Sequence, residues 1–186
     1  MTSVWELLAG SITFAWLLAR IPGLRGRALL ACAMGLVLVA GTALADLQPG
    51  GIWIATFEPF GVMLPALCAS ALAAGAGWIA PPAVSRAEKL IWAALMLVVL
   101  LGAGGALPLH PYTWFYAGWE SVLLVLCVAV WAFWRRQTLV LGAVALGQLM
   151  WLADVGSSNL YDHLAHTLLV PALAVSALWP GRTSGT

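Results

Sequence analysis

The stretch from Ser157 to Pro180, SSNLYDHLAHTLLVPALAVSALWP, gives the clearest structural signal in the chain. If it is helical, the polar side chains of its first half recur every three or four residues and share one face. These side chains belong to Asn159, Asp162, His163 and His166. From Leu168 to Trp179 the stretch is almost wholly apolar. We therefore expect one helix over 159–179, with an apolar part in lipid and a polar face at one membrane surface.

The composition of the whole chain agrees with a membrane environment. Of its 186 residues, 63% are hydrophobic and 8% are charged, and the mean hydropathy is +0.98. A soluble domain carries about 25% charged residues, so this chain lacks the side chains to cover a surface that faces water. Apolar runs long enough to cross ~30 Å of hydrocarbon recur along its length. The composition predicts an all-α, polytopic membrane protein that forms a single integral membrane domain over 1–186.

Seven membrane spans are predicted, and the positive charges orient them. The spans are 3–19, 27–45, 57–79, 89–107, 113–134, 138–155 and 159–179. With these spans, all eight basic residues fall on one side of the membrane: Arg20, Arg25, Arg27, Arg86, Lys89, Arg135, Arg136 and Arg182. Because cytoplasmic loops carry the excess of Lys and Arg, this side is the cytoplasmic one. The pattern predicts a multi-pass protein of the bacterial cytoplasmic (inner) membrane, with its N-terminus outside and its C-terminus inside.

An internal repeat links two of the predicted spans. Pro65–Leu72 (PALCASAL) and Pro171–Leu178 (PALAVSAL) are identical at six of eight positions. The match suggests two three-helix units, 1–80 and 112–180, joined by a linker helix over 89–107. Parallel repeats of this kind build some transporters, with the binding site at the repeat interface. The 3+1+3 layout, with its outside N-terminus, resembles the SWEET family of sugar transporters. This resemblance implies transport of a small solute between the two units.

The predicted topology also gathers polar side chains at the outer surface. Imidazole and carboxylate groups are ligands for copper, zinc and iron, and Asp162 and His166 at i, i+4 offer two ligands from one helix. His163 and His166 at i, i+3 are the alternative pair. The full set of candidate metal ligands is His166, His163, Asp162 and His110; the other polar residues that are candidates to line a site are Glu58, Glu120, Asn159, Gln148 and Asp154. A bis-histidine haem that joins His110 to His166 is less favoured, because such haems usually take a histidine from each of two membrane helices.

Residues 120–180 resemble part of a second family. A span that ends in Trp134-Arg135-Arg136 is followed by one that ends near a loop, and the next helix opens with D-H-L-A-H and continues into L-L-V-P-A-L. This order is similar to that of bacterial membrane proteins that assist the assembly of copper-containing cytochrome oxidase. The resemblance implies a copper site on the outer face, at the histidines of the last helix.

Three functions follow from these observations. The first is an accessory protein that handles a metal ion, copper or zinc, during assembly of a respiratory complex. The second is a small-solute transporter, and the third is a non-catalytic subunit of a larger membrane complex. A triad hydrolase is not favoured, since no serine lies in a nucleophile-elbow setting, and an enzyme of another kind is less expected than these three functions. The expected partners are the lipid bilayer and a larger membrane complex. The absence of a basic cluster argues against nucleic acid.

Overall fold

The computed structural model describes residues 3–24, 27–45, 48–57, 59–80, 84–116, 118–155 and 157–178. Regular structure within these ranges is entirely helical, which confirms the all-α class. The α-helices are α1 (Val4–Leu18), α2 (Ala28–Gly35), α3 (Thr42–Leu44), α4 (Gln48–Phe57), α5 (Met63–Gly75), α6 (Arg86–Ala103), α7 (Trp119–Trp134), α8 (Thr138–Leu152), α9 (Leu160–Leu164) and α10 (Leu169–Leu178). A π-helical segment (Leu36–Gly41) joins α2 to α3, and two 3-10 turns cover Pro22–Leu24 and Pro111–Phe115.

Each predicted span contains at least one helix, but two of the spans differ from the prediction. In the third predicted span, 57–79, helix α5 begins at Met63 rather than at residue 57. A separate helix, α4, precedes it. The expected continuous helix over 159–179 is wrong: α9 ends at Leu164 and α10 begins at Leu169. Prolines explain both differences. Pro65 and Pro171 are each the third residue of their helix, where a missing N–H is tolerated, and a proline ring clashes with the carbonyl four residues earlier.

Hydrogen bonds at the helix ends account for the other helix boundaries. Ser3 and Ser85 form capping boxes with Glu6 and Glu88, so α1 and α6 begin with their first N–H groups satisfied. Each of the helices α5, α6, α7 and α8 is followed by a residue of positive φ. The N–H of the residue after it donates to the carbonyl oxygen five positions earlier, as in a Schellman motif. The residues of positive φ are Gly77, Gly105, Arg136 and Asp154.

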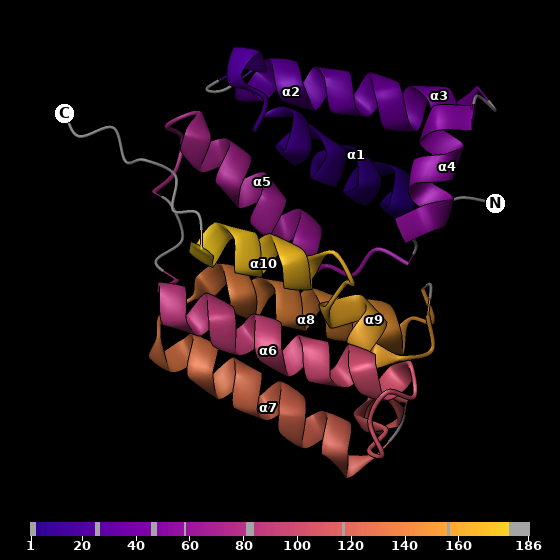
Figure 1. Ribbon diagram of the computed structural model, residues 1–186, viewed down its shortest axis with the longest axis vertical. Helices are drawn as coiled ribbons and strands as arrows, with labels where there is room; N and C mark the ends of the chain where they lie inside the picture. Colours follow the sequence, from indigo (N-terminus) through magenta and orange to yellow (C-terminus); the bar gives the residue numbers. More distant parts are fainter. Residues whose placement is uncertain are drawn as a thin grey trace.

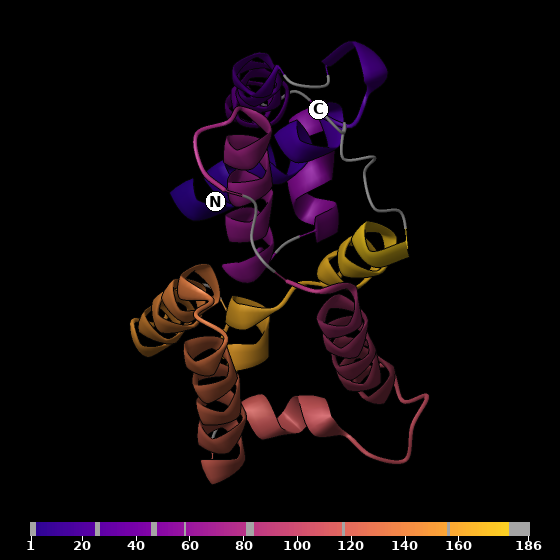
Figure 2. The same cartoon turned by 90° about the vertical axis from the view of Figure 1, so that its left-hand side faces the viewer.

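The long helices run back and forth in alternating directions (Figure 1). The elements α1 to α5 form one half of the molecule, and α6 to α10 form the other (Figures 1 and 2). In the first half α1 packs on α2 and α5, and in the second α10 packs mainly on α6 and α7 packs on α8. The two predicted three-helix units are thus not packed alike, because α5 packs on α1 whereas α10 packs on the linker helix α6. The halves meet where α5 packs on α8.

The main apolar core is shared by the two halves. Buried side chains of α5, such as Leu64 and Cys68, pack with Val144 of α8 and with Tyr161 and Leu169 near the chain's end. A smaller cluster of α1, α2 and α5 residues lies entirely within the first half. The halves therefore cannot separate fully without exposing core side chains to solvent.

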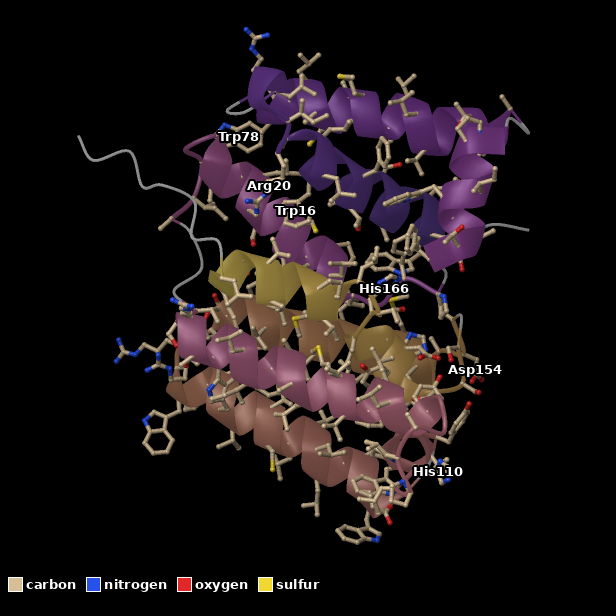
Figure 3. All side chains as sticks on the ribbon, in the orientation of Figure 1. Trp16, Arg20, Trp78, His110, Asp154 and His166 are labelled. Carbon is tan, nitrogen blue, oxygen red and sulfur yellow. The ribbon has the colours of Figure 1, made fainter. Side chains whose placement is uncertain are left out.

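Because the helices alternate in direction, the described basic residues lie at one end of the bundle. Arg20 follows α1, Arg27 precedes α2, and the remaining described basic residues lie at the start of α6 and in the turn between α7 and α8: Arg86, Lys89, Arg135 and Arg136. Figure 3 shows Arg20 at this end, and His110, Asp154 and His166 at the opposite end. We call the first the basic end and the second the histidine end. Arg25 and Arg182 lie outside the described residues.

Among the described residues, no single helix combines the length and the apolar character needed to cross a bilayer alone. The segments Ala28–Leu44 and Pro49–Phe57 reach that length and apolarity as a pair, but they are bent by 94° relative to one another.

Candidate functional site

Two helix interruptions pack against each other at the histidine end. One separates α4 from α5, and the other separates α9 from α10. Gly61 of the first interruption lies so close to the second that a Cβ atom there would come within 2.5 Å of the Ala165 carbonyl oxygen and 2.6 Å of the Asp162 carbonyl oxygen. We call this contact, between residues 57 and 59–62 on one side and 162–168 on the other, the junction.

The junction joins positions that the internal repeat makes equivalent. Pro65 and Pro171 are 106 positions apart, and the same offset relates Phe60 to His166. The rings of Phe60 and His166 stack with their centroids 5.0 Å apart and their planes within 10° of parallel. Both side chains are buried, with exposures of 2% and 4%. Equivalent residues of the two predicted units are therefore in direct contact.

Backbone hydrogen bonds across the junction follow the same equivalence. The Val62 N–H donates to the His163 carbonyl oxygen over 2.6 Å. The equivalent pair, by the offset of 106, is the Leu168 N–H and the Phe57 carbonyl. Here the imidazole of His166 lies between the two groups: its Nδ1 accepts from the Leu168 N–H over 3.0 Å, and its Nε2 contacts the Phe57 carbonyl oxygen. This pattern assigns the proton to Nε2.

Asp162 is held by hydroxyl groups beside the junction. The Tyr112 hydroxyl donates to both carboxylate oxygens over 2.9 Å, and the Ser157 hydroxyl donates to Oδ2 over 2.6 Å. Burial, together with the neighbouring carboxylate, raises the pKa of Tyr112, so its hydroxyl stays protonated as a donor. The Ser157 hydroxyl also accepts from the Asn159 N–H. Asp162 therefore ties the loop before α9 to the 3-10 turn before α7.

Asn159 and His163 are engaged in the same way. Asn159 is fully buried and caps α9: its Oδ1 accepts from the Tyr161 N–H over 2.8 Å, and its Nδ2 donates to the Tyr112 carbonyl over 3.1 Å. His163, exposed by 4%, places Nε2 2.6 Å from the Ser157 carbonyl oxygen. Both side chains thus pair with backbone carbonyls of partly buried residues, Tyr112 and Ser157, which would cost free energy if left without a partner.

The structure does not bring the predicted metal ligands together. Asp162 lies on α9 and His166 lies in the interruption that follows it, so their i, i+4 spacing does not place them on one helical face. His110 is exposed, faces the Gly102 carbonyl, and is well separated from His166 (Figure 3). In the part of the chain that the structure describes, no group of three or more His, Cys, Asp or Glu side chains is arranged to hold a metal ion.

The other predicted polar residues are dispersed. Glu120 lies in the first turn of α7 and Gln148 lies on α8, both partly buried. Asp154 is exposed and ends α8 with a φ of 52°. Glu58 lies outside the described residues. None of the described members of this set lines the cavity that α5 and α10 share.

That cavity lies between the two halves and has a volume of about 370 Å³. Its walls come from α1 and from α5 to α10. The repeat-equivalent residues Leu67 and Leu173 both line it, as do Ser70 and Ser176. Each serine hydroxyl donates to the carbonyl three residues earlier, over 2.9 Å in α5 and 3.0 Å in α10. The cavity is thus bounded by the same face of two helices that share a sequence motif.

Two cations that no sequence pattern marked as site residues also line the cavity. They are Arg20, which follows α1, and Lys89, in the first turns of α6. Sequence patterns placed both at the basic end but gave no reason to turn them inward rather than toward water. Only the packing of α1 and α6 around a common space shows that they share a site.

No protein family, no curated protein and no solved structure matches this chain.

Proposed function

We propose that this chain is a seven-span protein of the bacterial cytoplasmic membrane, with its N-terminus outside and its C-terminus inside. We further propose that it carries a small amphiphilic solute through the cavity between its two halves. The observation that carries this proposal is the pair of helix interruptions at repeat-equivalent positions, packed against each other beside a cavity that both interrupted helices line. Interrupted helices at a repeat interface are a recurring feature of transporter binding sites.

The outer surface of the bundle supports a lipid environment. Along α7, large apolar side chains spaced by three or four residues are more than half exposed: Val122, Leu126, Val130 and Phe133. A soluble monomer rarely leaves such a continuous apolar stripe uncovered. The grouping of the described cations at one end of the bundle supports the orientation, because cytoplasmic ends carry the excess of Lys and Arg.

The side chains that line the cavity favour an amphiphile over a sugar or an ion. Most of its lining side chains are apolar, and the hydroxyls of Ser70 and Ser176 already donate to their own helices. A polar solute would lose its water without gaining partners along these walls. We therefore keep the transporter hypothesis but change two of its parts. The residues that line the cavity differ from the predicted ones, and the proposed solute is an amphiphile.

The junction gives the proposed carrier a gate at the histidine end. The stacked rings of Phe60 and His166 lie beside Met63 and Leu169, which line that end of the cavity, and we assign the gate to these rings and to the bonds of Val62 and His166. Opening requires these few contacts to break, while the core shared by α5, α8 and α9 holds the halves together. The proposal thus assigns His166 to gating.

Membrane orientation is tested first, by single cysteines in a variant without Cys32, Cys68 and Cys127. Thr113→Cys lies at the histidine end and Thr138→Cys at the basic end, and both positions are exposed. A maleimide that cannot cross membranes should label position 113 in intact cells and position 138 only after the cells are opened. The reverse pattern, or labelling of both positions in intact cells, would reject the orientation.

Transport is tested in proteoliposomes with a single-chain lipid that carries a fluorescent head group. Its transfer between leaflets, followed by dithionite quenching, should be faster than in liposomes without protein. Ala71→Phe, which fills the cavity from α5, should return the rate to that of empty liposomes. Ala94→Phe is the matched control, because Ala94 is exposed on α6 and does not line the cavity. Transfer by the wild type at the rate of empty liposomes would reject the carrier.

The subunit hypothesis draws on the same apolar stripe of α7, because helices of a partner protein would cover it as well as lipid does. It predicts that the chain purifies with a larger complex and that Ala71→Phe has no effect on that complex. Metal handling stays a prediction, and each of its proposed ligands has a described hydrogen-bond partner.

A further inference from the structure

The cavity is apolar along its length and positively charged at one end. Met63 and Leu169 line it close to the junction. Arg20 and Lys89 line it at the basic end, where α1 stops and α6 begins. A space with this gradient matches a molecule that has an apolar body and one negatively charged end.

The two cations are available to a ligand. The Arg20 guanidinium lies 4.6 Å from the ring centroid of Trp16, which also lines the cavity. Lys89 is partly buried. No Asp or Glu is present among the described lining residues. The neighbouring carboxylate, Glu88, accepts from Arg135 over 2.6 Å and from the Ser85 N–H over 2.8 Å, so it is already engaged elsewhere.

The length of the cavity suits one acyl chain. Its lining runs along α5 from Met63 to Ala74, which is roughly 16 Å at ~1.5 Å per residue. This length is about half of the ~30 Å hydrocarbon core of a bilayer, the depth that the chain of a single leaflet occupies. The volume of about 370 Å³ lies at the lower end of the range for small-molecule pockets, which leaves room for one chain rather than two.

We propose that the cavity binds a single-chain lipid with an anionic head group. Its head lies between Arg20 and Lys89, and its chain lies between the α5 and α10 faces marked by Leu67 and Leu173. This inference rests on the proposed function, since it names the class of solute that the cavity carries. The head gains two cationic partners, and the chain replaces contacts that the apolar walls cannot make with water.

The test uses the full-length protein in nanodiscs of zwitterionic phosphatidylcholine. The two probes are palmitate and hexadecanol, each with a diazirine at the same position of the chain. Palmitate should cross-link to residues that line the cavity, with a stoichiometry approaching one, and should bind about tenfold more tightly than hexadecanol. Unlabelled hexadecyl phosphate should compete. Inorganic phosphate should not, because the head group alone lacks the contacts of the chain. Competition by inorganic phosphate at equal concentration would overturn the proposal.

Matched variants assign the charge. The double variant Arg20→Gln, Lys89→Gln should lose the preference for palmitate over hexadecanol while retaining binding of hexadecanol. Arg86→Gln removes a cation from the same end that does not line the cavity, and it should leave the preference unchanged. A preference that survives the double variant, or that Arg86→Gln removes, would overturn the proposal. The comparison of the two probes on the wild type needs no variant, so a misfolded mutant leaves the test intact.

The outcomes separate this inference from the proposed function. Equal binding of both probes inside the cavity, blocked by Ala71→Phe, would overturn the anionic head group and leave the carrier standing. Cross-linking of palmitate only to the outer faces of α6 and α7 would overturn the inference and the proposed binding cavity together.

Discussion

Phe60 and His166 stack face to face although 105 residues of chain separate them, and the internal repeat makes their positions equivalent. The imidazole also links the Leu168 N–H to the Phe57 carbonyl, whereas the equivalent contact on the other side, from Val62 to His163, is a direct backbone hydrogen bond. His166 therefore both stacks on an aromatic ring and bridges two backbone groups that are not bonded directly. This relationship makes His166 a structural link between the halves.

His166→Phe should keep the stacking on Phe60 but lose both contacts of the imidazole nitrogens with the backbone. The Leu168 N–H and the Phe57 carbonyl would then lack their partner, at a cost of about 2 kcal/mol. For a chain of this size we expect the apparent melting temperature in detergent to fall by about 4–8 °C. His110→Phe is the comparison: this exposed side chain contacts one carbonyl, that of Gly102, so the expected change is smaller, about 0.5–1 kcal/mol. Equal melting temperatures for wild type and His166→Phe would show that the link contributes nothing.

The metal hypothesis is measured by elemental analysis of the purified protein after exposure to copper and to zinc. Because Asp162, His163 and His166 each hold other parts of the chain, we expect no stoichiometric metal in the wild type or in His166→Ala. One metal ion per chain in the wild type, lost in His166→Ala, would contradict this expectation. It would restore the outer-face site that the sequence suggested.

Gly61→Ala should weaken the junction. A Cβ atom at this position would lie within 2.6 Å of two carbonyl oxygens of the opposing segment, so the interruptions would have to move apart. We expect a loss of stability of about 1–3 kcal/mol, seen as a lower melting temperature. Gly142→Ala serves as the comparison, because nothing lies within 4 Å of its added Cβ and alanine favours helix α8. An unchanged melting temperature for Gly61→Ala would mean that the close approach is not maintained.

Glu88 should contribute to stability in a pH-dependent manner. Hydrogen bonds from the Ser85 backbone and from Arg135 lower the pKa of its carboxyl from an ordinary value of 4.5 to about 2. A lowered pKa means that the contribution is complete above pH 4.5 and is lost as the pH falls toward 2. Melting curves between pH 5 and pH 2.5 should therefore be less pH-dependent in Glu88→Gln than in the wild type. Because the pair is near the surface, the difference should be small and should shrink in high salt. A steeper pH dependence in Glu88→Gln than in the wild type would show that the ionised Glu88 carboxylate does not stabilise the fold.

Asp154 should be replaceable by glycine with a gain in stability. Its φ of 52° lies in the left-handed region that ends a helix, where glycine carries no steric cost. We expect Asp154→Gly to raise the melting temperature by an amount that corresponds to about 1 kcal/mol, and to leave lipid transfer unchanged. Loss of transfer in this variant would instead identify Asp154 as a polar site residue, as the sequence analysis suggested.

Local patterns in the sequence determined the all-helical class, the approximate ranges of the helices and the grouping of the described cations at one end. These features depend on apolar runs and on charges between them, which can be read one segment at a time. The motif shared by Pro65–Leu72 and Pro171–Leu178 also marked two helices that line one cavity. Pro65 and Pro171 are also local features, and a ring at the third helical residue blocks the turn before it. The predicted helices over 57–79 and 159–179 nevertheless ran through both prolines, so the interruptions were not predicted.

Only the tertiary structure decided what the polar residues do. The spacing of Asp162 and His166 suggested a pair of ligands, but a break in the helix directs each to a different partner. Arg20 and Lys89 looked like ordinary boundary charges until the packing of α1 and α6 placed them at one cavity. The physical reason is that a hydrogen-bond partner or a shared space is set by segments far apart in the chain. The sequence states which groups are present, and the fold determines which of them meet.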